Sequence, residues 1–483
     1  MKQSIASDAV KLTTSKFITL LISLVTAMLL SRFRTLEEYG TYSQIMLVIS
    51  LTTTIFMLGL PNSINYFLAR TEDPIERNRF LSVYYTFSTI LSFIAGLVLV
   101  ISAPLIVRYF DNALIKNFIY VLAIYPWARI IQSSIDNVLI VYKKTNHLMA
   151  FRIINSIFLL LIIIIVEAFN WGFAMYMALF IVVEAVFAVI VYILVKNIAG
   201  NIKIYFDKTL IRTIMNFSLP IGLASVVGTL KTELDKLVIA GFYDTESLAI
   251  YTNAAREMPV NIIASSITAV LMPQMVKMLK RNEKVEAVNL WGNATLFSYV
   301  IICFFATGLF VYAPEVMSLL YSDKYISGAP VFRVYALVLL FRSTYFGMVL
   351  NSIGKTKIIL NCSVIALVLN FVLNFIFYYM FGFIGPAIAT LVATLGSAMY
   401  LLWSTSKTIK IPFVRIFPWK TILYITMINI LFGFAFAVIK QVIPLEVKYG
   451  EVLESVSLGL IWGVLYLLVT YKFLKNKWDV LNE

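Results

Sequence analysis

The chain has few charged residues and almost none of the side chains that metal, redox and hydrolytic sites require. Charged residues make up 13% of its 483 residues, and it contains one histidine and two cysteines. His147 falls in a predicted connecting loop, which excludes a histidine base, a histidine-ligated metal or a serine–histidine pair within the membrane. Cys303 and Cys362 both lie inside apolar stretches and form no CxxC motif, so we expect no disulfide, metal or redox chemistry.

The sequence also lacks a nucleotide-binding loop and any connection long enough to form a soluble domain. No Walker A or glycine-rich nucleotide motif is present, so ATP does not drive this chain directly. The longest connections between apolar stretches lie near residues 61–80 and 196–212. Membrane glycosyltransferases and glycan polymerases usually keep their catalytic groups in a sizeable extramembrane loop. We therefore predict that the protein is not an enzyme and needs no cofactor or metal.

Long apolar stretches dominate the sequence. Hydrophobic residues make up 61% of the chain, and the mean hydropathy is +0.89. A helix needs about 20 apolar residues to cross the hydrocarbon of a bilayer, and it keeps its backbone hydrogen bonds internal. We predict an all-α polytopic membrane protein with about fourteen transmembrane helices. The predicted spans one to fourteen are residues 14–31, 42–60, 81–103, 117–141, 148–168, 172–195, 213–242, 251–277, 290–313, 330–351, 358–379, 383–404, 419–440 and 455–474.

The basic residues between these stretches alternate sides. With the N-terminus in the cytoplasm, the cytoplasmic segments carry 26 Lys and Arg residues and the opposite loops carry 7. Basic side chains resist translocation, so this bias predicts cytoplasmic N- and C-termini. The net charge of +14 then reflects contact with anionic lipid headgroups. We accordingly expect membrane lipids, and no nucleic acid, as partners.

An offset near 210 residues relates two halves of the chain. Ala103-Pro104 recurs as Ala313-Pro314, Lys144-Thr145 as Lys355-Thr356, and Gly172-Phe173 as Gly382-Phe383, each at an equivalent point of the predicted topology. Six spans per half is an even number, so the two repeats are parallel, as in alternating-access transporters. The predicted domains are an N-lobe (residues 1–200), a C-lobe (201–410) and two extra C-terminal helices (411–483).

Charged residues within the spans are the candidates for function, because an ionisable group in hydrocarbon is costly. Span seven carries four of them within six residues: Lys231, Glu233, Asp235 and Lys236. Such a helix needs a polar side that faces a water-filled interior. The alternative is pairing within the helix, of Lys231 with Asp235 and of Glu233 with Lys236, which are four and three residues apart.

Further charges and several helix-breaking residues fall in other spans. Arg256 and Glu257 lie in span eight, and Arg129 and Arg342 fall mid-span in spans four and ten, where structural pairing and ligand contact are both open. Arg333 lies close enough to the outer boundary to snorkel. Proline removes a helical hydrogen bond and kinks a helix. The prolines concerned are Pro126, Pro220 and Pro259, and we regard Pro220, Gly222 and Pro259 as candidate hinges, with a static kink as the alternative.

Several short motifs, in order, give the chain a family resemblance. They are Leu58-Gly59-Leu60-Pro61-Asn62-Ser63 closing span two, Leu234-Asp235-Lys236 in span seven, Ala249-Ile250-Tyr251-Thr252-Asn253 opening span eight, Leu271-Met272-Pro273 ending it, and Asn351-Ser352-Ile353-Gly354-Lys355-Thr356 after span ten. With the repeat, these resemble the Wzx-type O-antigen and polysaccharide flippases of the multidrug/oligosaccharidyl-lipid/polysaccharide exporter superfamily.

This resemblance implies two six-helix lobes around a cavity lined largely by spans one, two, seven and eight. It also implies a flippase that moves an undecaprenyl-pyrophosphate-linked oligosaccharide, such as an O-antigen unit of lipopolysaccharide, from the inner to the outer leaflet by ion-coupled alternating access. Polymerase and chain-length proteins of glycan assembly are the further partners expected. The alternatives are a cation-coupled drug or small-molecule exporter or a lipid II flippase of the same superfamily, and a membrane enzyme or scaffold in glycan assembly.

Under the flippase hypothesis the charged residues of the spans divide into two roles. Pyrophosphate binding requires cations, and coupling to H⁺ or Na⁺ requires carboxylates whose protonation or metal binding differs between the two facing states. The predicted substrate-binding residues are Lys231 and Arg256, followed by Arg129 and Arg342, and the predicted coupling residues are Glu233, Asp235 and Glu257.

Overall fold

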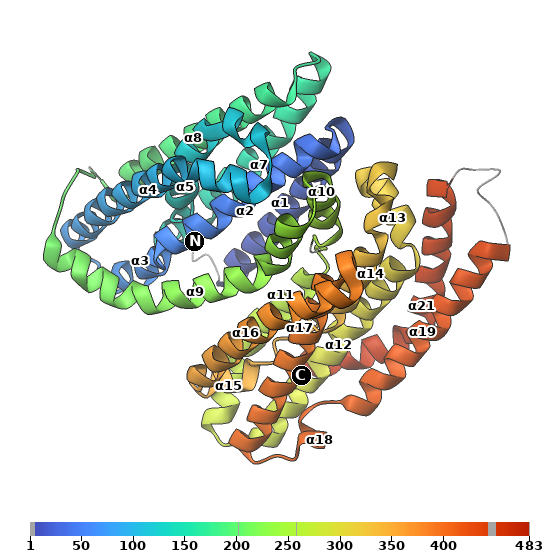
Figure 1. Ribbon diagram of the computed structural model, residues 1–483. Helices are drawn as coiled ribbons and strands as arrows, with labels where there is room; N and C mark the ends of the chain where they lie inside the picture. Colours follow the sequence, from blue (N-terminus) through green and yellow to red (C-terminus); the bar gives the residue numbers. More distant parts are fainter. Residues whose placement is uncertain (1–4, 201, 257, 443–450, 483) are drawn as a thin grey trace. The chain divides into compact units, whose positions relative to one another are not determined.

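The computed structural model describes residues 5–200, 202–256, 258–442 and 451–482, and every regular element in these ranges is a helix. The chain divides into two compact units, Met1–Ala249 and Ile250–Glu483, and each is described by itself (Figure 1). This division falls later than the predicted end of the N-lobe at residue 200, because span seven packs within the first unit. The predicted domain boundaries stay a prediction.

The first unit contains nine helices in the described residues, and a tenth contains its boundary. They are α1 (Ile5–Phe33), α2 (Leu36–Met57), α3 (Leu60–Leu68), α4 (Pro74–Phe110), α5 (Ile119–Gln132), α6 (Ile135–Val141), α7 (Thr145–Ala168), α8 (Phe173–Ala199), α9 (Lys208–Phe242) and the boundary helix α10 (Thr245–Ala254), with a 3₁₀ turn at Ala113–Phe118.

The second unit is also helical throughout its described residues. Its helices are α11 (Asn261–Lys280), α12 (Lys284–Val311), α13 (Ala313–Tyr321), α14 (Ala329–Leu340), α15 (Met348–Ser352), α16 (Thr356–Phe381), α17 (Gly385–Ile409), α18 (Phe413–Ile416), α19 (Trp419–Val442) and α21 (Glu451–Asn482), with 3₁₀ turns at Asp323–Gly328 and Gly382–Ile384.

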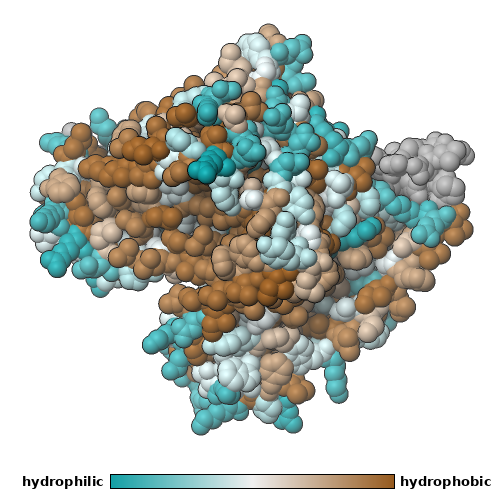
Figure 2. Space-filling model, viewed as in Figure 1, coloured by the Kyte–Doolittle hydropathy of each residue, from teal (hydrophilic) through white to brown (hydrophobic). Residues whose placement is uncertain are grey.

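The helices confirm a polytopic membrane protein. Twelve stretches of the described residues are long and apolar enough to span a bilayer. One of these stretches, 356–409, contains two helices, α16 and α17, and so corresponds to two predicted spans. Predicted span ten is not among the twelve, because its helices α14 and α15 are short. With these two differences, the twelve stretches match the fourteen spans predicted from the sequence. Figure 2 shows hydrophobic residues over much of the visible face, as expected for a surface in contact with lipid.

In the first unit, α9 crosses the junction of α2 and α3 at very short range. Leu58 and Gly59, between those helices, have left-handed φ angles of 48° and 70°. The backbone of Gly222 in α9 lies against them, so that a Cβ atom on Gly222 would stand 2.4 Å from the Leu58 carbonyl carbon. Thr229 extends the contact by donating a 3.3 Å hydrogen bond to Thr54 of α2. Although Pro220 lies within α9, this helix is continuous from Lys208 to Phe242, and it is visibly bent in Figure 1.

In the second unit, the two C-terminal helices form part of the hydrophobic core. Trp462 of α21 stacks on Phe436 of α19 with ring centroids 5.0 Å apart, and both belong to a buried cluster with residues of α12. Asn429 of α19 donates a hydrogen bond of 3.0 Å to the Tyr466 hydroxyl, which in turn donates to the Val300 carbonyl of α12. Spans thirteen and fourteen are therefore fastened to span nine.

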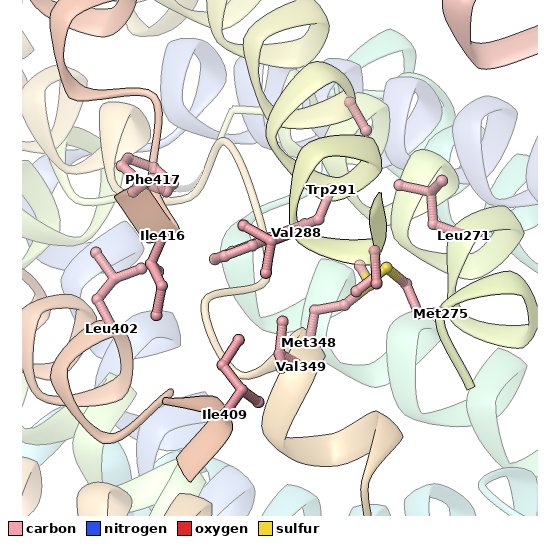
Figure 3. Packing of buried hydrophobic residues seen from close by; sticks show 12 residues of the cluster. Leu271, Met275, Val288, Trp291, Met348, Val349, Leu402, Ile409, Ile416 and Phe417 are labelled. Atoms are coloured by element: carbon pink, nitrogen blue, oxygen red, sulfur yellow. The ribbon is translucent and has the colours of Figure 1, made fainter. Parts of the chain in front are cut away.

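A second cluster surrounds the short helix α15. Figure 3 shows Val288, Met348 and Val349 at the centre of this cluster, flanked by side chains of α11 and α17. Met348, Val349 and Trp291 are each at most 1% exposed. Because the cluster holds α15 against α12, it fixes the position of the residues that join α14 to α15, where Arg342 lies.

Candidate functional site

Four predicted membrane spans contain a break in the helix, two in each sequence repeat. Span two is interrupted at residues 58–59 and span eight between Ala254 and Asn261; span four is interrupted at 133–134 and span ten at 341–347. At the repeat offset near 210, the break of span four corresponds to that of span ten, whereas the break of span two lies near the end of its span and that of span eight near the start. Non-helical backbone at membrane depth is tolerated only where it is buried in protein or lines a cavity. Interruptions at corresponding positions of two halves mark the binding site in many transporters.

The helix of predicted span eight, 251–277, is broken near Pro259, which the sequence marked as a candidate hinge. α10 ends at Ala254 and α11 begins at Asn261, so Arg256 lies in the gap between them, together with Pro259. Pro259 is the one predicted hinge proline at a break. Pro126 lies inside α5 and Pro220 inside α9, and neither ends its helix.

The breaks of the first unit are joined to each other. Asn137 at the start of α6 donates a 2.8 Å hydrogen bond to the Pro61 carbonyl of α3 and accepts one of 2.8 Å from Asn65. The Ser134 hydroxyl, within the break of span four, lies 2.7 Å from the Tyr85 hydroxyl of α4. The polar groups exposed by the two breaks thereby find partners on neighbouring helices.

The break between α14 and α15 in the second unit is satisfied by side chains of α12. Ser298 donates a 2.6 Å hydrogen bond to the Ser343 carbonyl, and Trp291 donates one of 2.9 Å to the Thr344 hydroxyl. Thr295 adds a 3.0 Å hydrogen bond to the same hydroxyl. Arg342, next in sequence to Ser343, is positioned by this network.

The two breaks of the second unit bring Arg256 and Arg342 to one pocket. The lining is otherwise apolar apart from Tyr335, and it includes Met258 from the gap after α10 and Leu339 at the end of α14. The pocket holds about 10 Å³, which is close to the volume that one water molecule needs. Both arginine side chains are partly exposed. Two arginines from two discontinuous helices thus line one pocket.

Two polar side-chain atoms that flank the gap after α10 are buried and lack a hydrogen-bond partner within the part of the chain that the structure describes. They are the Thr252 hydroxyl and the side-chain oxygen Oδ1 of Asn261. Leaving a buried polar group unpaired costs about 1–3 kcal/mol. These two atoms, one on each side of the gap, are the kind of group that water or a ligand satisfies. Predicted coupling residue Glu257 lies outside the described residues.

In the first unit, Arg129 lies beside a buried carboxylate. Its guanidinium is in hydrogen-bonding reach of Tyr125 and in electrostatic reach of Glu184 on α8. Glu184 is 5% exposed and accepts a 2.7 Å hydrogen bond from the Gln132 side chain of α5. Sequence reasoning assigned Glu184 no role. The signal available in the sequence was Gln132, one helical turn after Arg129 in the same predicted span.

The charged segment of span seven is partly neutralised within the helix. Lys236 pairs with Glu233 at 2.7 Å, which confirms one of the two pairings considered from the sequence. Asp235 is 1% exposed, and one of its oxygens accepts a 2.9 Å hydrogen bond from the Lys236 backbone N–H. Lys231 is partly exposed and lies one turn before Asp235 in α9.

Two asparagines of α16 form a buried polar pair that the sequence reasoning missed. Asn370 and Asn374 are at most 1% exposed, and Asn374 donates a 2.8 Å hydrogen bond to the Asn370 carbonyl. Asn370 also donates to Thr390 of α17 at 3.4 Å. The signal available in the sequence was this pair of asparagines, four residues apart within an apolar stretch. Among the described residues, no three His, Cys, Asp or Glu side chains are grouped to hold a metal ion.

A family model described as "Polysaccharide biosynthesis protein" matches residues 29–330, which is more than half of the chain. The chain belongs to this polysaccharide biosynthesis family. An uncharacterized membrane protein of Methanocaldococcus jannaschii is 27% identical over 294 residues, covering 56% of this chain and 57% of that protein. The capsular polysaccharide biosynthesis protein CapF of Staphylococcus aureus is 23% identical over 239 residues, covering 47% and 59%. The match thus spans less than two thirds of either curated relative.

Solved structures share the fold over most of their length. The lipid II flippase MurJ, in an inward closed conformation, superposes with a TM-score of 0.74 at 17% identity, covering 95% of this chain and 98% of that one. An inward-facing multidrug resistance transporter of the MATE family, in the MOP superfamily, gives a TM-score of 0.67 at 15% identity, covering 81% and 96%. The fold is therefore that of this transporter superfamily.

Proposed function

We propose that the protein is a flippase that moves an undecaprenyl-pyrophosphate-linked oligosaccharide, an O-antigen unit or a similar repeat, from the inner to the outer leaflet of the bacterial cytoplasmic membrane. Membership of the polysaccharide biosynthesis family and a transporter fold support this class of function. The observation that carries the proposal is the pocket at which Arg256 and Arg342 meet.

The chemistry of that pocket suits a diphosphate. A guanidinium presents a planar fork of donors that matches phosphate oxygens, and it stays charged at all physiological pH values. Two such groups, supplied by the ends of broken helices, provide charge-assisted hydrogen bonds within a largely apolar wall. Because the pocket holds only about 10 Å³ here, the diphosphate enters in the alternating-access state in which the pocket is wider. Lys231 and Arg129, in the first unit, are the further cations proposed for the substrate path.

Coupling to H⁺ or Na⁺ would require a carboxylate whose state changes with the direction of access. Asp235, almost wholly buried in α9, is the best supported of the predicted coupling residues. Glu233 is less well suited, because Lys236 already neutralises it. Glu184 joins the candidates, because burial opposes its charged form while Arg129 favours it. Polymerase and chain-length proteins would receive the flipped product.

A lipid II flippase is the second candidate. The fold match to MurJ covers 98% of that chain, and lipid II also carries a diphosphate on a polyprenyl chain. Both candidates use the same arginine pocket and differ in the glycan, so transport assays with the two lipid-linked glycans distinguish them.

Direct binding of the diphosphate lipid tests the role of the pocket. The full-length protein in nanodiscs is titrated with undecaprenyl pyrophosphate, and the bound lipid is counted by native mass spectrometry. We expect Arg256→Gln and Arg342→Gln each to weaken binding by roughly tenfold or more, the equivalent of about 1.5–3 kcal/mol for a hydrogen bond to a charged group.

Arg333→Gln provides the matched control. Arg333 lies in α14, and Arg342 lies just after the end of that helix. The Arg333 guanidinium donates a 3.2 Å hydrogen bond to the Phe310 carbonyl, and Arg333 does not line the pocket. Its substitution should leave the affinity unchanged. Equal effects of Arg333→Gln and Arg342→Gln, or undiminished binding by both pocket variants, would refute the assignment.

A further inference from the structure

The segment that connects α8 to α9, residues 202–207, lies along the first turns of α4; we call it the strap. It has no helical structure, and two of its backbone N–H groups bond to hydroxyls of α4. The Lys203 N–H donates to Ser82 at 3.3 Å, and the Tyr205 N–H donates to Thr86 at 3.1 Å. Ser82 and Thr86 are four residues apart and share one face of α4, so they hold alternate residues of an extended chain.

Both ends of the strap are tied to the same helix. At the first end, Asn78 donates a 3.1 Å hydrogen bond to the carbonyl of Ala199, the last residue of α8. At the other end, Arg79 forms an ion pair with Asp207. Asp207 also caps α9 by accepting a 3.0 Å hydrogen bond from the Leu210 N–H. The strap is therefore a fixed wall of the first unit.

A pocket of about 520 Å³ lies between the strap, the end of α8 and the start of α4. Its polar lining consists of Arg79, Lys203, Asn78, Ser82 and Tyr205; no carboxylate lines it, although Arg79 is ion-paired with Asp207. Among the described residues, Lys203 has no ion-pair partner. The pocket thus presents two cations and neutral hydrogen-bonding groups, which is the chemistry that recognises a phosphate.

Exposed apolar side chains lie at this pocket and in the strap. Ile75 lines the pocket and is 78% exposed, while Ile204 and Phe206, which alternate along the strap with the lining residues Lys203 and Tyr205, are 94% and 64% exposed. Helix α4 has 37 residues and is about 55 Å long, whereas the hydrocarbon core is about 30 Å thick, so its first turns extend into the headgroup region. The charge bias of the loops predicts that this end faces the cytoplasm, where anionic lipids attract basic residues. Exposed apolar side chains beside cations at this depth suit a lipid, whose phosphate and acyl chains they can contact together.

We propose that this pocket binds the headgroup of an anionic phospholipid of the inner leaflet. Lys203 and Arg79 hold the phosphate, Asn78 and Ser82 contact the polar headgroup, and Ile75, Ile204 and Phe206 contact the acyl chains next to the glycerol. Asp207 competes with the lipid for Arg79. The site is separate from the arginine pocket of the second unit and does not depend on the transported substrate.

Lipid titration of the full-length protein in detergent tests this site. Phosphatidylglycerol is compared with phosphatidylcholine, and lipid retained per protein is measured by native mass spectrometry. We expect Lys203→Gln to weaken phosphatidylglycerol binding about fivefold, the equivalent of one basic residue near an anionic surface, with little effect on phosphatidylcholine. Lys208→Gln is the matched control, because Lys208 begins α9 next to the strap but does not line the pocket. This variant should bind phosphatidylglycerol with the same affinity as the unaltered protein.

Asp207→Asn separates a binding role from a structural one. Asparagine still caps a helix, so α9 keeps its first turn, while Arg79 is released for the lipid. The proposal predicts tighter phosphatidylglycerol binding by this variant. Weaker binding by Asp207→Asn would overturn it, as would equal losses in Lys203→Gln and Lys208→Gln. Glycerol 3-phosphate at equal concentration should not displace the lipid, and full displacement would identify a site for a soluble phosphate instead.

Discussion

Substitution of Gly222 by alanine tests the closest crossing in the first unit. The added Cβ would stand 2.4 Å from the Leu58 carbonyl carbon and 2.7 Å from the Gly59 nitrogen. Both atoms belong to backbone, so no flexible side chain can move aside. Ordinary contact begins at 3.4 Å, so α9 must retreat by about 1 Å from the junction of α2 and α3. Overpacking of this kind typically costs about 1–3 kcal/mol.

Gly228→Ala in the same helix is the control. A Cβ at Gly228 meets nothing within 4 Å, and alanine improves helix propensity by about 1 kcal/mol. Thermal unfolding of the two purified variants in one detergent measures the difference. Because both glycines lie inside α9, both variants gain the same helix propensity, and Gly222→Ala should be less stable than Gly228→Ala by the overpacking cost of about 1–3 kcal/mol. Equal stabilities would refute the packing argument. Equal stability with loss of transport in Gly222→Ala would instead support a hinge at this residue.

Three other perturbations follow from the described contacts. Thr344→Val leaves the buried indole N–H of Trp291 without its acceptor, and it should lower the free energy of unfolding by about 1–3 kcal/mol in chemical denaturation. Gln132→Leu removes the donor to the buried Glu184 carboxylate and should destabilise by a similar amount of about 1–3 kcal/mol, whereas an unchanged unfolding midpoint would show that this contact is dispensable. The Asp207 pKa is lowered by the hydrogen bond from the Leu210 N–H and by Arg79. The ionised carboxylate therefore stabilises the strap at pH values above the ordinary carboxyl pKa. This stabilisation is lost as the pH falls through the lowered pKa. The protection factors of the strap amides should therefore fall as the pH drops through and below the ordinary carboxyl value of 3.8, and Asp207→Asn should abolish that dependence.

The membrane architecture follows from the sequence because lipid imposes a single requirement, apolar length, on each pass. Local charge pairing is also predictable where the partners share a helix, as Glu233 and Lys236 do. The repeat could be detected because equivalent positions carry equivalent dipeptides. The structure adds one feature at equivalent positions, the interruption of spans four and ten, and it also interrupts spans two and eight at positions that do not correspond.

The positions of the breaks were harder to predict, because proline alone does not determine them. Pro126 and Pro220 lie in continuous helices, whereas residues 133–134 and 341–347 contain no proline and are interrupted. Hydrogen bonds from other helices, such as that of Ser298 to the Ser343 carbonyl, satisfy the backbone at the break. Such partners lie 45 residues away in sequence, and no local pattern reveals them. The meeting of Arg256 and Arg342 depends on the same breaks.

The distribution of the lipid-linked oligosaccharide between the two leaflets tests the central claim most directly. An impermeant glycan-modifying probe is applied to cells that lack this gene and to the same cells that carry the wild-type gene or the Arg256→Gln/Arg342→Gln double variant. The proposal predicts that undecaprenyl-linked oligosaccharide is protected from the probe without the gene and accessible with the wild-type gene. It also predicts protection with the double variant when that protein is present at a normal level. Equal accessibility with and without the gene would contradict the flippase function.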